Sequence, residues 1–129
     1  MTGPMEIASA CALSGARFIY ASSHSVYGHV ARDVAIPEDA ELDLCSGPLN
    51  PYARSKLQLD MSMAEKFSSG PSEGLEWIGL RCTNVFGTGE HHKGPMASII
   101  SQLLRQAACG GRLRLFANTL EACRDYIPV

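Results

Sequence analysis

The sequence predicts an α/β protein whose strands form a parallel sheet. Two short apolar runs, at residues 17–23 and 75–81, are typical of strands buried on both faces of a sheet. Between them, the pattern of apolar residues predicts a helix over 51–67. A strand, a helix and a second strand in this order form a βαβ unit, and the two strands of such a unit run parallel.

The ends of the central helix are clearly marked. Asn50 is a good N-cap because its side-chain oxygen can accept a hydrogen bond from a free N–H of the first turn. Pro51 suits the first helical position, where its missing N–H costs nothing. Residues 68–71, Ser-Ser-Gly-Pro, are expected to end the helix.

The remaining elements are expected around this unit. A short helix is expected over 5–13, and an amphipathic helix should begin at Pro95, end at Gly110-Gly111 and lead into a strand at 112–116. Residues 24–49 and 84–89 are predicted to be loops. The second loop would follow a parallel strand, and ligands of open α/β sheets bind at that end of the strands.

The bulk composition excludes several classes of protein. The chain has 129 residues and a net charge of −2, which argues against a nucleic-acid or membrane surface built on positive charge. It contains no signal-peptide pattern and no apolar run of about 18 residues, so no membrane span is expected. Five cysteines without a C-x-x-C pair suggest free thiols in a reducing cytoplasm. No metal is expected, because neighbouring residues such as His91 and His92 point apart in an extended loop.

Tyr52 and Lys56 form the most informative pair of residues. They are four positions apart, so both side chains lie on one face of the first two helical turns. An ammonium group beside a phenol favours the phenolate, which is the form that acts as a general base. A buried tyrosine beside a solvated lysine is the alternative interpretation of this pair on its own.

Four stretches of the chain together resemble a known family. They are Tyr20-Ala-Ser-Ser-His-Ser-Val-Tyr-Gly28, Asn50-Pro-Tyr-Ala-Arg-Ser-Lys56, Leu80-Arg-Cys-Thr-Asn-Val-Phe-Gly87 and Arg124-Asp-Tyr126. Their order resembles the extended short-chain dehydrogenase/reductases, the NAD-dependent epimerase/dehydratases of nucleotide sugars. The resemblance implies an incomplete Rossmann-like parallel sheet with helices, a nucleotide-sugar substrate and NADP (or NAD) as cofactor.

A further segment points to one group within this family. Residues 92–98, His-Lys-Gly-Pro-Met-Ala-Ser, are similar to a segment of the ADP-glyceromanno-heptose 6-epimerases. Pro95 and Gln102 depart from that pattern, as do Cys82, Thr83 and Thr88 from the family's wider pattern. A UDP-hexose 4-epimerase or a sugar-nucleotide dehydratase therefore remains an alternative.

The resemblance also implies the roles of individual residues. The catalytic residues would be Ser23, Tyr52, Lys56 and Lys93. The cofactor would contact Tyr52, Lys56, Val85 and Lys93, and the sugar nucleotide would contact Ser23, Asn84, Phe116 and Arg124. Arg124 suits a pyrophosphate because a guanidinium binds phosphate oxygens bidentately. Tyr52 and Lys93 would exchange protons on opposite faces of the sugar.

One expected feature of the family does not occur in the sequence. No G-x-x-G-x-x-G turn, which binds the cofactor's pyrophosphate, is found in the 129 residues. We therefore expect a fragment that is inactive alone, with residues 1–83 as the C-terminal part of the Rossmann-like NAD(P)-binding domain and 84–129 as the start of the substrate-binding region. The alternative is a truncated, non-catalytic module that self-associates or pairs with a missing N-terminal half, because an incomplete sheet exposes an edge and apolar faces.

Overall fold

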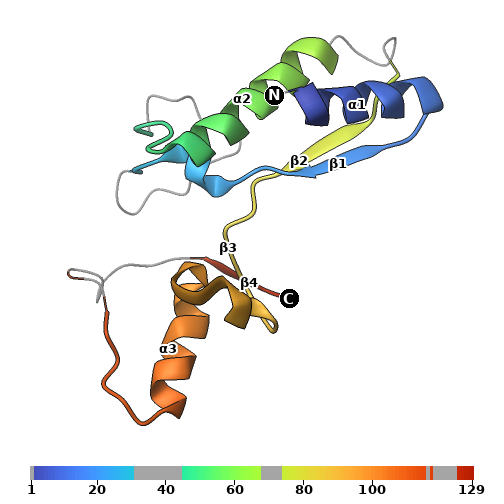
Figure 1. The fold of residues 1–129 in the computed structure, drawn as a ribbon. Coiled ribbons are helices and arrows are strands. Elements are labelled where there is room, and N and C mark those ends of the chain that lie inside the picture. The colour runs from blue at the N-terminus through green and yellow to red at the C-terminus, as the bar shows by residue number, and fades with distance from the viewer. Residues whose placement is uncertain (1, 31–44, 68–73, 116, 118–124) are drawn as a thin grey trace. The chain divides into compact units, whose positions relative to one another are not determined.

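The structure is a computed structural model that describes residues 2–30, 45–67, 74–115, 117 and 125–129. The chain divides into two compact units, Met1–Cys82 and Thr83–Val129. Each unit contains two parallel strands with a helix between them in the sequence (Figure 1). The prediction of an α/β protein with parallel strands is therefore confirmed.

The N-terminal unit contains the predicted βαβ arrangement. Its elements are α1 (Thr2–Ser14), β1 (Phe18–Ala21), the short 3₁₀ helix η1 (His24–Tyr27), α2 (Pro51–Phe67) and β2 (Trp77–Leu80). Strands β1 and β2 run parallel, with Phe18 opposite Trp77 and Ala21 opposite Leu80. Within the stretch predicted as a long loop, Val30 forms an isolated antiparallel bridge with Cys45, and residues 31–44 lie outside the described part of the chain.

One face of the β1–β2 sheet carries the core of this unit. Ala8 of α1 and Met63 of α2 are fully buried there, and both helices pack against Phe18 and Trp77. The ring of Tyr20 stacks between these two aromatic residues, at centroid distances of 5.6 and 6.2 Å. A large apolar side chain that is fully buried, such as Met63, contributes about 1.5–3 kcal/mol to folding.

The opposite face of the same sheet is exposed within this unit. Ile19 is 57% exposed, Ile78 49% and Leu80 50%. Successive residues of a strand point to opposite faces, so these three side chains alternate with partly buried residues of the other face. Together, Ile19, Ile78 and Leu80 form an apolar surface that is called the outer face below.

The C-terminal unit is smaller. Its elements are β3 (Asn84–Phe86), the 3₁₀ segment η4 (Glu90–Met96), α3 (Ile99–Ala108) and β4 (Tyr126–Pro128). Strands β3 and β4 run parallel, with Asn84 opposite Tyr126. The rings of Phe86 and Tyr126 meet edge to face, with their centroids 6.0 Å apart.

Three sequence predictions for this unit are wrong. The amphipathic helix begins at Ile99 rather than Pro95, because Ser98 caps it by accepting a hydrogen bond from the Ser101 N–H. The predicted loop at 84–89 contains strand β3, which pairs with a segment about 40 residues later. Residues 111–115 form no strand, and the Arg114 N–H that a ladder would use donates instead to Gln106 Oε1.

Candidate active site

The start of α2 positions Tyr52 and Lys56. Asn50 Oδ1 accepts a hydrogen bond from the Ala53 N–H at 2.8 Å, which confirms the predicted cap and fixes the first turn. The Lys56 ammonium lies 5.7 Å from the centre of the Tyr52 ring. It also donates a hydrogen bond of 2.7 Å to the carbonyl oxygen of Ala21, at the end of β1. The lysine therefore joins the helix to the carboxyl end of the strand.

The polar groups of this pair keep hydrogen-bonding capacity for a ligand. Tyr52 is 57% exposed, and its hydroxyl makes no hydrogen bond to the described residues. Lys56 uses one of its three N–H donors on Ala21, which leaves two for other acceptors. A phenol and an ammonium with free hydrogen-bonding capacity can thus face a ribose from one side of α2.

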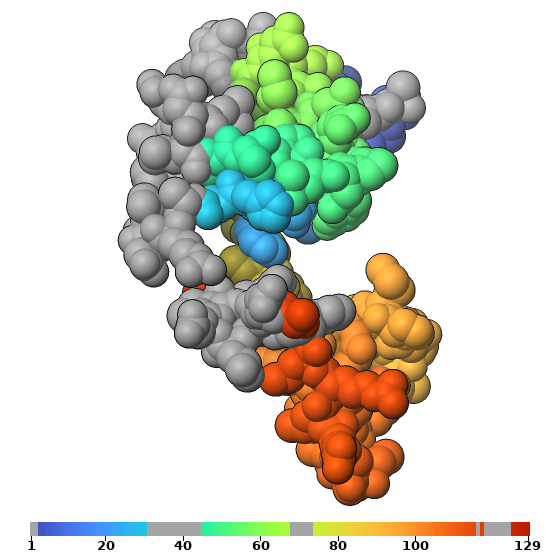
Figure 2. All heavy atoms as spheres, turned by 90° about the vertical axis from the view of Figure 1, so that its left-hand side faces the viewer, coloured from blue at the N-terminus to red at the C-terminus, as the bar shows by residue number. Residues whose placement is uncertain are grey.

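Ser23 lies two residues beyond the carbonyl that holds Lys56. It is 7% exposed, and its Oγ accepts a hydrogen bond from the Ser25 N–H at 3.2 Å and lies 2.8 Å from Ser25 Oγ. These contacts cap η1, which packs against α2, as Figure 2 shows for the blue and turquoise surfaces. Ser23, Tyr52 and Lys56 therefore come from neighbouring segments of one unit.

Asp60 organises a polar cluster that the sequence analysis missed. Its carboxylate accepts hydrogen bonds from Tyr20 Oη at 2.9 Å, Ser22 Oγ at 2.9 Å and Arg81 Nε at 3.1 Å. The Asp60 side chain is only 12% exposed. Asp60 lies four residues after Lys56, on the same face of α2, and this spacing was the available signal. These four residues, Tyr20, Ser22, Asp60 and Arg81, are called the Asp60 cluster below.

The Asp60 cluster is connected to η1 and to a small cavity. Arg81 Nη1 donates a hydrogen bond of 2.7 Å to Tyr27 Oη, and its guanidinium lies 5.0 Å from the centre of the Tyr27 ring. Burial and the hydrogen bond to Asp60 raise the pKa of Tyr20 well above its usual range. Tyr20, Asp60 and Arg81 line a cavity of about 210 Å³. The cluster thus fixes β1, β2 and η1 around the strand end that precedes Ser23.

Lys93 lies in η4 and is held by Glu90, which the sequence analysis also missed. Lys93 Nζ donates to Glu90 Oε1 at 3.1 Å, and the hydroxyls of Ser98 and Ser101 donate to Glu90 Oε2 at 2.5 Å each. Hydrogen bonds from Ser101, Ser98 and Lys93 lower the pKa of Glu90 to about 2. These residues, Glu90, Lys93, Ser98 and Ser101, are called the Glu90 cluster. The Lys93 side chain remains 47% exposed.

The other predicted site residues belong to the C-terminal unit. Asn84 Nδ2 donates a hydrogen bond of 3.1 Å to the Asp125 carbonyl, and Val85 is 42% exposed on β3. Phe116 and Arg124 lie outside the described residues. The structure therefore brings Ser23, Tyr52 and Lys56 together in one unit and assigns Asn84, Val85 and Lys93 to the other.

The described residues show neither a metal-ligand cluster nor a membrane-spanning helix. Within the described ranges, no three His, Cys, Asp or Glu side chains gather as a metal site. The rings of His91 and His92 meet edge to face with centroids 6.2 Å apart. No helix in the described part of the chain has the length and apolar composition to cross a membrane.

Known proteins resemble this chain in both sequence and structure. The ADP-L-glycero-D-manno-heptose-6-epimerase of Brachyspira hyodysenteriae is 36% identical over 113 residues, which is 88% of this chain and 34% of that protein. The crystal structure of the Helicobacter pylori enzyme of the same name matches with a TM-score of 0.75 at 27% identity, over 96% of this chain and 36% of that one. A UDP-N-acetylglucosamine 4-epimerase from Methanobrevibacter ruminantium, in complex with UDP-N-acetylmuramic acid, matches with a TM-score of 0.74 at 26% identity, over 97% and 38% of the two chains.

These matches bear on the fold and on the family. The chain spans about a third of the length of the relatives it matches. Their structural similarity confirms that the parallel strands and helices belong to a Rossmann-like fold. The sequence profile of the NAD dependent epimerase/dehydratase family matches residues 1–129. The chain therefore belongs to the NAD dependent epimerase/dehydratase family.

Proposed function

We propose that this chain is a catalytic portion of an NAD(P)-dependent nucleotide-sugar epimerase that acts on an ADP-heptose. The observation that carries the proposal is the Lys56 side chain, which lies beside Tyr52 and is anchored to the end of β1. Membership of the family and the identity of 36% to a heptose epimerase support it.

The proposed reaction inverts one carbon of the sugar by transient oxidation. When bound, the nicotinamide cofactor would accept a hydride from this carbon and return it to the opposite face. Tyr52 removes the hydroxyl proton on one face, assisted by the positive charge of Lys56, and Ser23 donates a hydrogen bond to the reacting oxygen. Lys93 exchanges the proton on the other face. Epimerisation requires a proton-transfer group for each face, which one tyrosine and one lysine provide.

The same proposal assigns a role to each part of the chain. Residues 1–83 would form the C-terminal part of the NAD(P)-binding domain, and residues 84–129 the start of the substrate-binding region. Asn84, Phe116 and Arg124 would contact the sugar nucleotide, and Val85 the cofactor, NADP or NAD. We also propose a cytoplasmic location, supported by Cys11, Cys45, Cys82 and Cys109, which are free thiols.

The decisive experiment replaces the two proposed bases in a protein extended to the length of its relatives. Tyr52→Phe and Lys93→Ala should each lower the rate of ADP-heptose epimerisation by about 10²–10⁴-fold, the usual contribution of a positioned acid or base. Lys66→Ala is the matched control. Lys66 lies near the C-terminal end of α2, away from Tyr52 and Lys56, and donates a hydrogen bond to Ser9 of α1. Unchanged epimerisation by the Lys93→Ala protein would remove Lys93 from the mechanism.

The state of the cofactor site is tested on the 129-residue chain itself. The sequence contains no G-x-x-G-x-x-G turn, so we expect the chain to bind NADP more weakly than about 1 mM. Isothermal titration calorimetry measures this affinity. Tight binding would show that the residues present already form a sufficient cofactor site.

A non-catalytic assembly module is the second candidate, and the outer face favours it. Ile19, Ile78 and Leu80 are all about half exposed within their unit, and apolar patches of this kind mark interaction sites. The proposed occupant of this face is a second copy of the chain or a missing N-terminal half. Sedimentation at several concentrations tests self-association, and a stable, well-folded monomer that is inert to an added N-terminal half would contradict the module.

A different sugar substrate is the third candidate. The similarity to a UDP-N-acetylglucosamine 4-epimerase structure favours it, because its TM-score is close to that of the heptose epimerase. The length-extended protein would distinguish the two in a direct competition between ADP-heptose and UDP-hexose. Turnover of the UDP-hexose alone would contradict the proposed heptose substrate and favour a UDP-hexose 4-epimerase. Dehydration of either sugar would favour a dehydratase.

A further inference from the structure

The lysines of the chain differ in the kind of oxygen that their ammonium groups contact. They are Lys56, Lys66 and Lys93. Lys56 and Lys66 donate to neutral oxygens, a main-chain carbonyl and a serine hydroxyl. Lys93 donates to Glu90 Oε1 at 3.1 Å, and among the described residues it is the lysine that contacts a carboxylate. The two lysines with proposed catalytic roles, Lys56 and Lys93, are therefore held by chemically different acceptors.

The carboxylate of Glu90 is filled by donors of its own unit. Its Oε1 accepts from Lys93 Nζ and, at 3.3 Å, from the Ser98 N–H. Its Oε2 accepts from the hydroxyls of Ser98 and Ser101. These donors match the roughly four lone-pair directions of a carboxylate, and the Glu90 side chain is only 10% exposed. A substrate hydroxyl could reach Glu90 only by displacing one of these donors.

The same contacts keep Glu90 in its charged form. Hydrogen bonds from Ser101, Ser98 and Lys93 lower the pKa of Glu90 to about 2, so the carboxylate carries its negative charge at neutral pH. A group that stays ionised in this way is not suited to give or take a proton during turnover. Its electrostatic effect falls on the cation that it contacts, the Lys93 ammonium.

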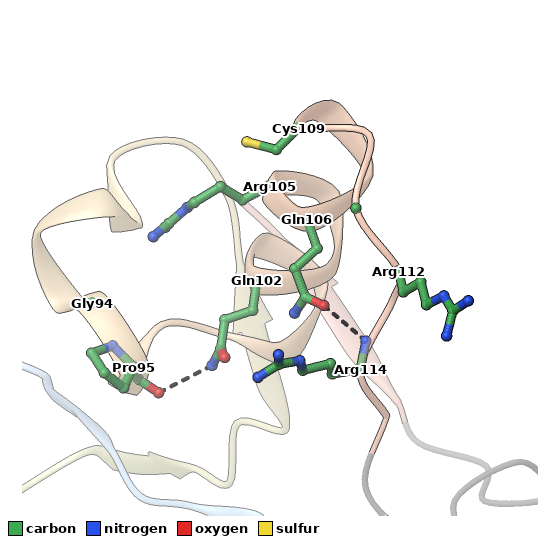
Figure 3. Close-up of a pocket in the computed structure, with 9 residues that line it drawn as sticks. Gly94, Pro95, Gln102, Arg105, Gln106, Cys109, Arg112 and Arg114 are labelled. Carbon is green, nitrogen blue, oxygen red and sulfur yellow. Dashed lines mark hydrogen bonds between the residues drawn. The ribbon is translucent and has the colours of Figure 1, made fainter.

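The backbone that follows Lys93 is fixed independently of Glu90. Gly94 has φ 53° and ψ −125°, a conformation that favours glycine, and it interrupts the helical turn directly after the lysine. Gln102 Nε2 of α3 donates to the Pro95 carbonyl at 3.0 Å (Figure 3) and to the Ala97 carbonyl at 2.8 Å. The main chain beside Lys93 is thus tied to α3, and an anchor is needed only for the long side chain.

Lys93 keeps the capacity to exchange a proton while it is anchored. An ammonium has three N–H donors, and the described residues use one of them, on Glu90. The Lys93 side chain is 47% exposed, so the other two donors can reach a ligand. Fixing a flexible four-carbon side chain before the substrate arrives removes rotamer freedom that the reaction would otherwise have to remove.

We propose that Glu90 is a positioning residue that acts through Lys93, by fixing the direction in which the ammonium presents its proton. When this proton moves to the sugar oxygen, an N–H bond breaks, an O–H bond forms and the lysine becomes a neutral amine. Glu90 takes no proton in this step and keeps its charge. The inference rests on the proposed function, in which Lys93 exchanges a proton with the sugar, and adds to it the residue that orients Lys93.

The first test requires neither a substrate nor a cofactor. In the 129-residue chain, ¹⁵N NMR of the lysine ammonium groups measures how fast their protons exchange with water. Glu90→Gln should speed the exchange at Lys93 by about fivefold, because a hydrogen bond to a charged acceptor becomes one to a neutral amide. The signals of Lys56 and Lys66 should not change. Ser101→Ala is the matched control, because it removes a donor from Oε2 and leaves the charge of Glu90 in place.

The second test is a double-mutant cycle in the protein extended to the length of its relatives. Glu90→Gln should lower kcat for epimerisation by at least about tenfold when Lys93 is present, and should lower it no further in the Lys93→Ala protein. A residue with a merely structural role would lower the rate in both backgrounds. Glu76→Gln, which changes an exposed ion pair with Arg17 in the other unit, should leave the rate unchanged.

The possible failures are distinguishable. Equal losses of kcat in the two backgrounds, or ammonium exchange at Lys93 that Glu90→Gln does not alter, would overturn the inference and leave Lys93 in the proposed mechanism. Unchanged epimerisation by the Lys93→Ala protein would instead remove Lys93 from the mechanism, and the positioning role of Glu90 with it. The rate of the Lys93→Ala protein alone therefore shows which of the two proposals has failed.

Discussion

The Asp60 cluster and the Glu90 cluster have the same kind of hydrogen bonds, but their partners lie at different distances along the sequence. Each has a carboxylate that accepts hydrogen bonds from hydroxyls and from one cationic side chain. The partners of Asp60 lie 21 to 40 residues away in the sequence. The partners of Glu90 lie 3 to 11 residues away.

This difference in sequence separation shows which part of the structure positions Ser23 and which part positions Lys93. The Asp60 cluster exists only when α2 packs against both β1 and β2, so the geometry around Ser23 depends on the tertiary fold. The Glu90 cluster can form within the turns of η4 and the cap of α3. Lys93 is therefore positioned by local structure, whereas Ser23 is positioned by the fold of its unit.

Removing Asp60 should produce the largest effect on stability. Asp60→Ala removes the carboxylate that accepts from the Arg81 Nε–H and from the Tyr20 hydroxyl, both of which are partly buried. We expect the free energy of unfolding to fall by about 2–4 kcal/mol, measured by urea denaturation with circular dichroism. Glu76→Ala, which breaks an exposed ion pair with Arg17, should cost at most about 1 kcal/mol. Equal losses of unfolding free energy in the two variants would show that Asp60 does not stabilise the tertiary fold more than an exposed ion pair does.

The Tyr20 phenol should respond to alkaline pH as a group tied to the fold. Its folded pKa is raised by burial and by the Asp60 hydrogen bond, above the unfolded value of about 10. Its contribution to stability is therefore present below about pH 10 and is lost as the pH rises further. In a titration followed by tyrosinate absorbance, Tyr20→Phe should remove the ionisation that occurs at the highest pH. If Tyr20 itself titrated near pH 10 in the folded chain, its hydrogen bond to Asp60 would be contradicted.

Acidic pH should weaken the Glu90 cluster, and the loss of stability should be smaller and more local than the loss at the Asp60 cluster. The folded pKa of Glu90 is lowered to about 2, below an ordinary value of about 4.3. Its contribution is therefore present above about pH 4.3 and is lost as the pH falls toward 2. Carboxyl NMR should show this low pKa together with shifts in the Ser98 and Ser101 amides. Glu90→Gln should abolish these shifts and leave the Tyr20 signals of the other unit unchanged.

The sequence was most informative where the determinants are local. Asn50 and Pro51 predicted the start of α2, and the observed helix spans Pro51–Phe67 as expected. The start of α3 was misplaced because Pro95 resembles a first helical residue, while Ser98 makes the actual cap. Strand β3 could not be predicted, because its three residues become a strand only by pairing with β4.

The residues of the candidate site also divide into those predictable from local sequence and those that depend on tertiary contacts. The pair Tyr52 and Lys56 was visible from its spacing of four residues, and their side chains do lie together. The roles of Asp60 and Glu90 were not predicted. Glu90 has all its partners nearby, so a search for a carboxylate three residues before Lys93 would have found it. Asp60 becomes recognisable only when Tyr20, Ser22 and Arg81 arrive from other elements.

The anchor of Lys56 has a consequence for how this protein tolerates mutation. Its acceptor is the main-chain carbonyl of Ala21, which every amino acid supplies. Side-chain substitutions at position 21 therefore leave the acceptor in place as long as the path of the strand is kept. During evolution, the side chain at position 21 can therefore change while the orientation of the lysine is inherited with the backbone, whereas Phe18 and Tyr20 of the same strand are tied to the core and to Asp60.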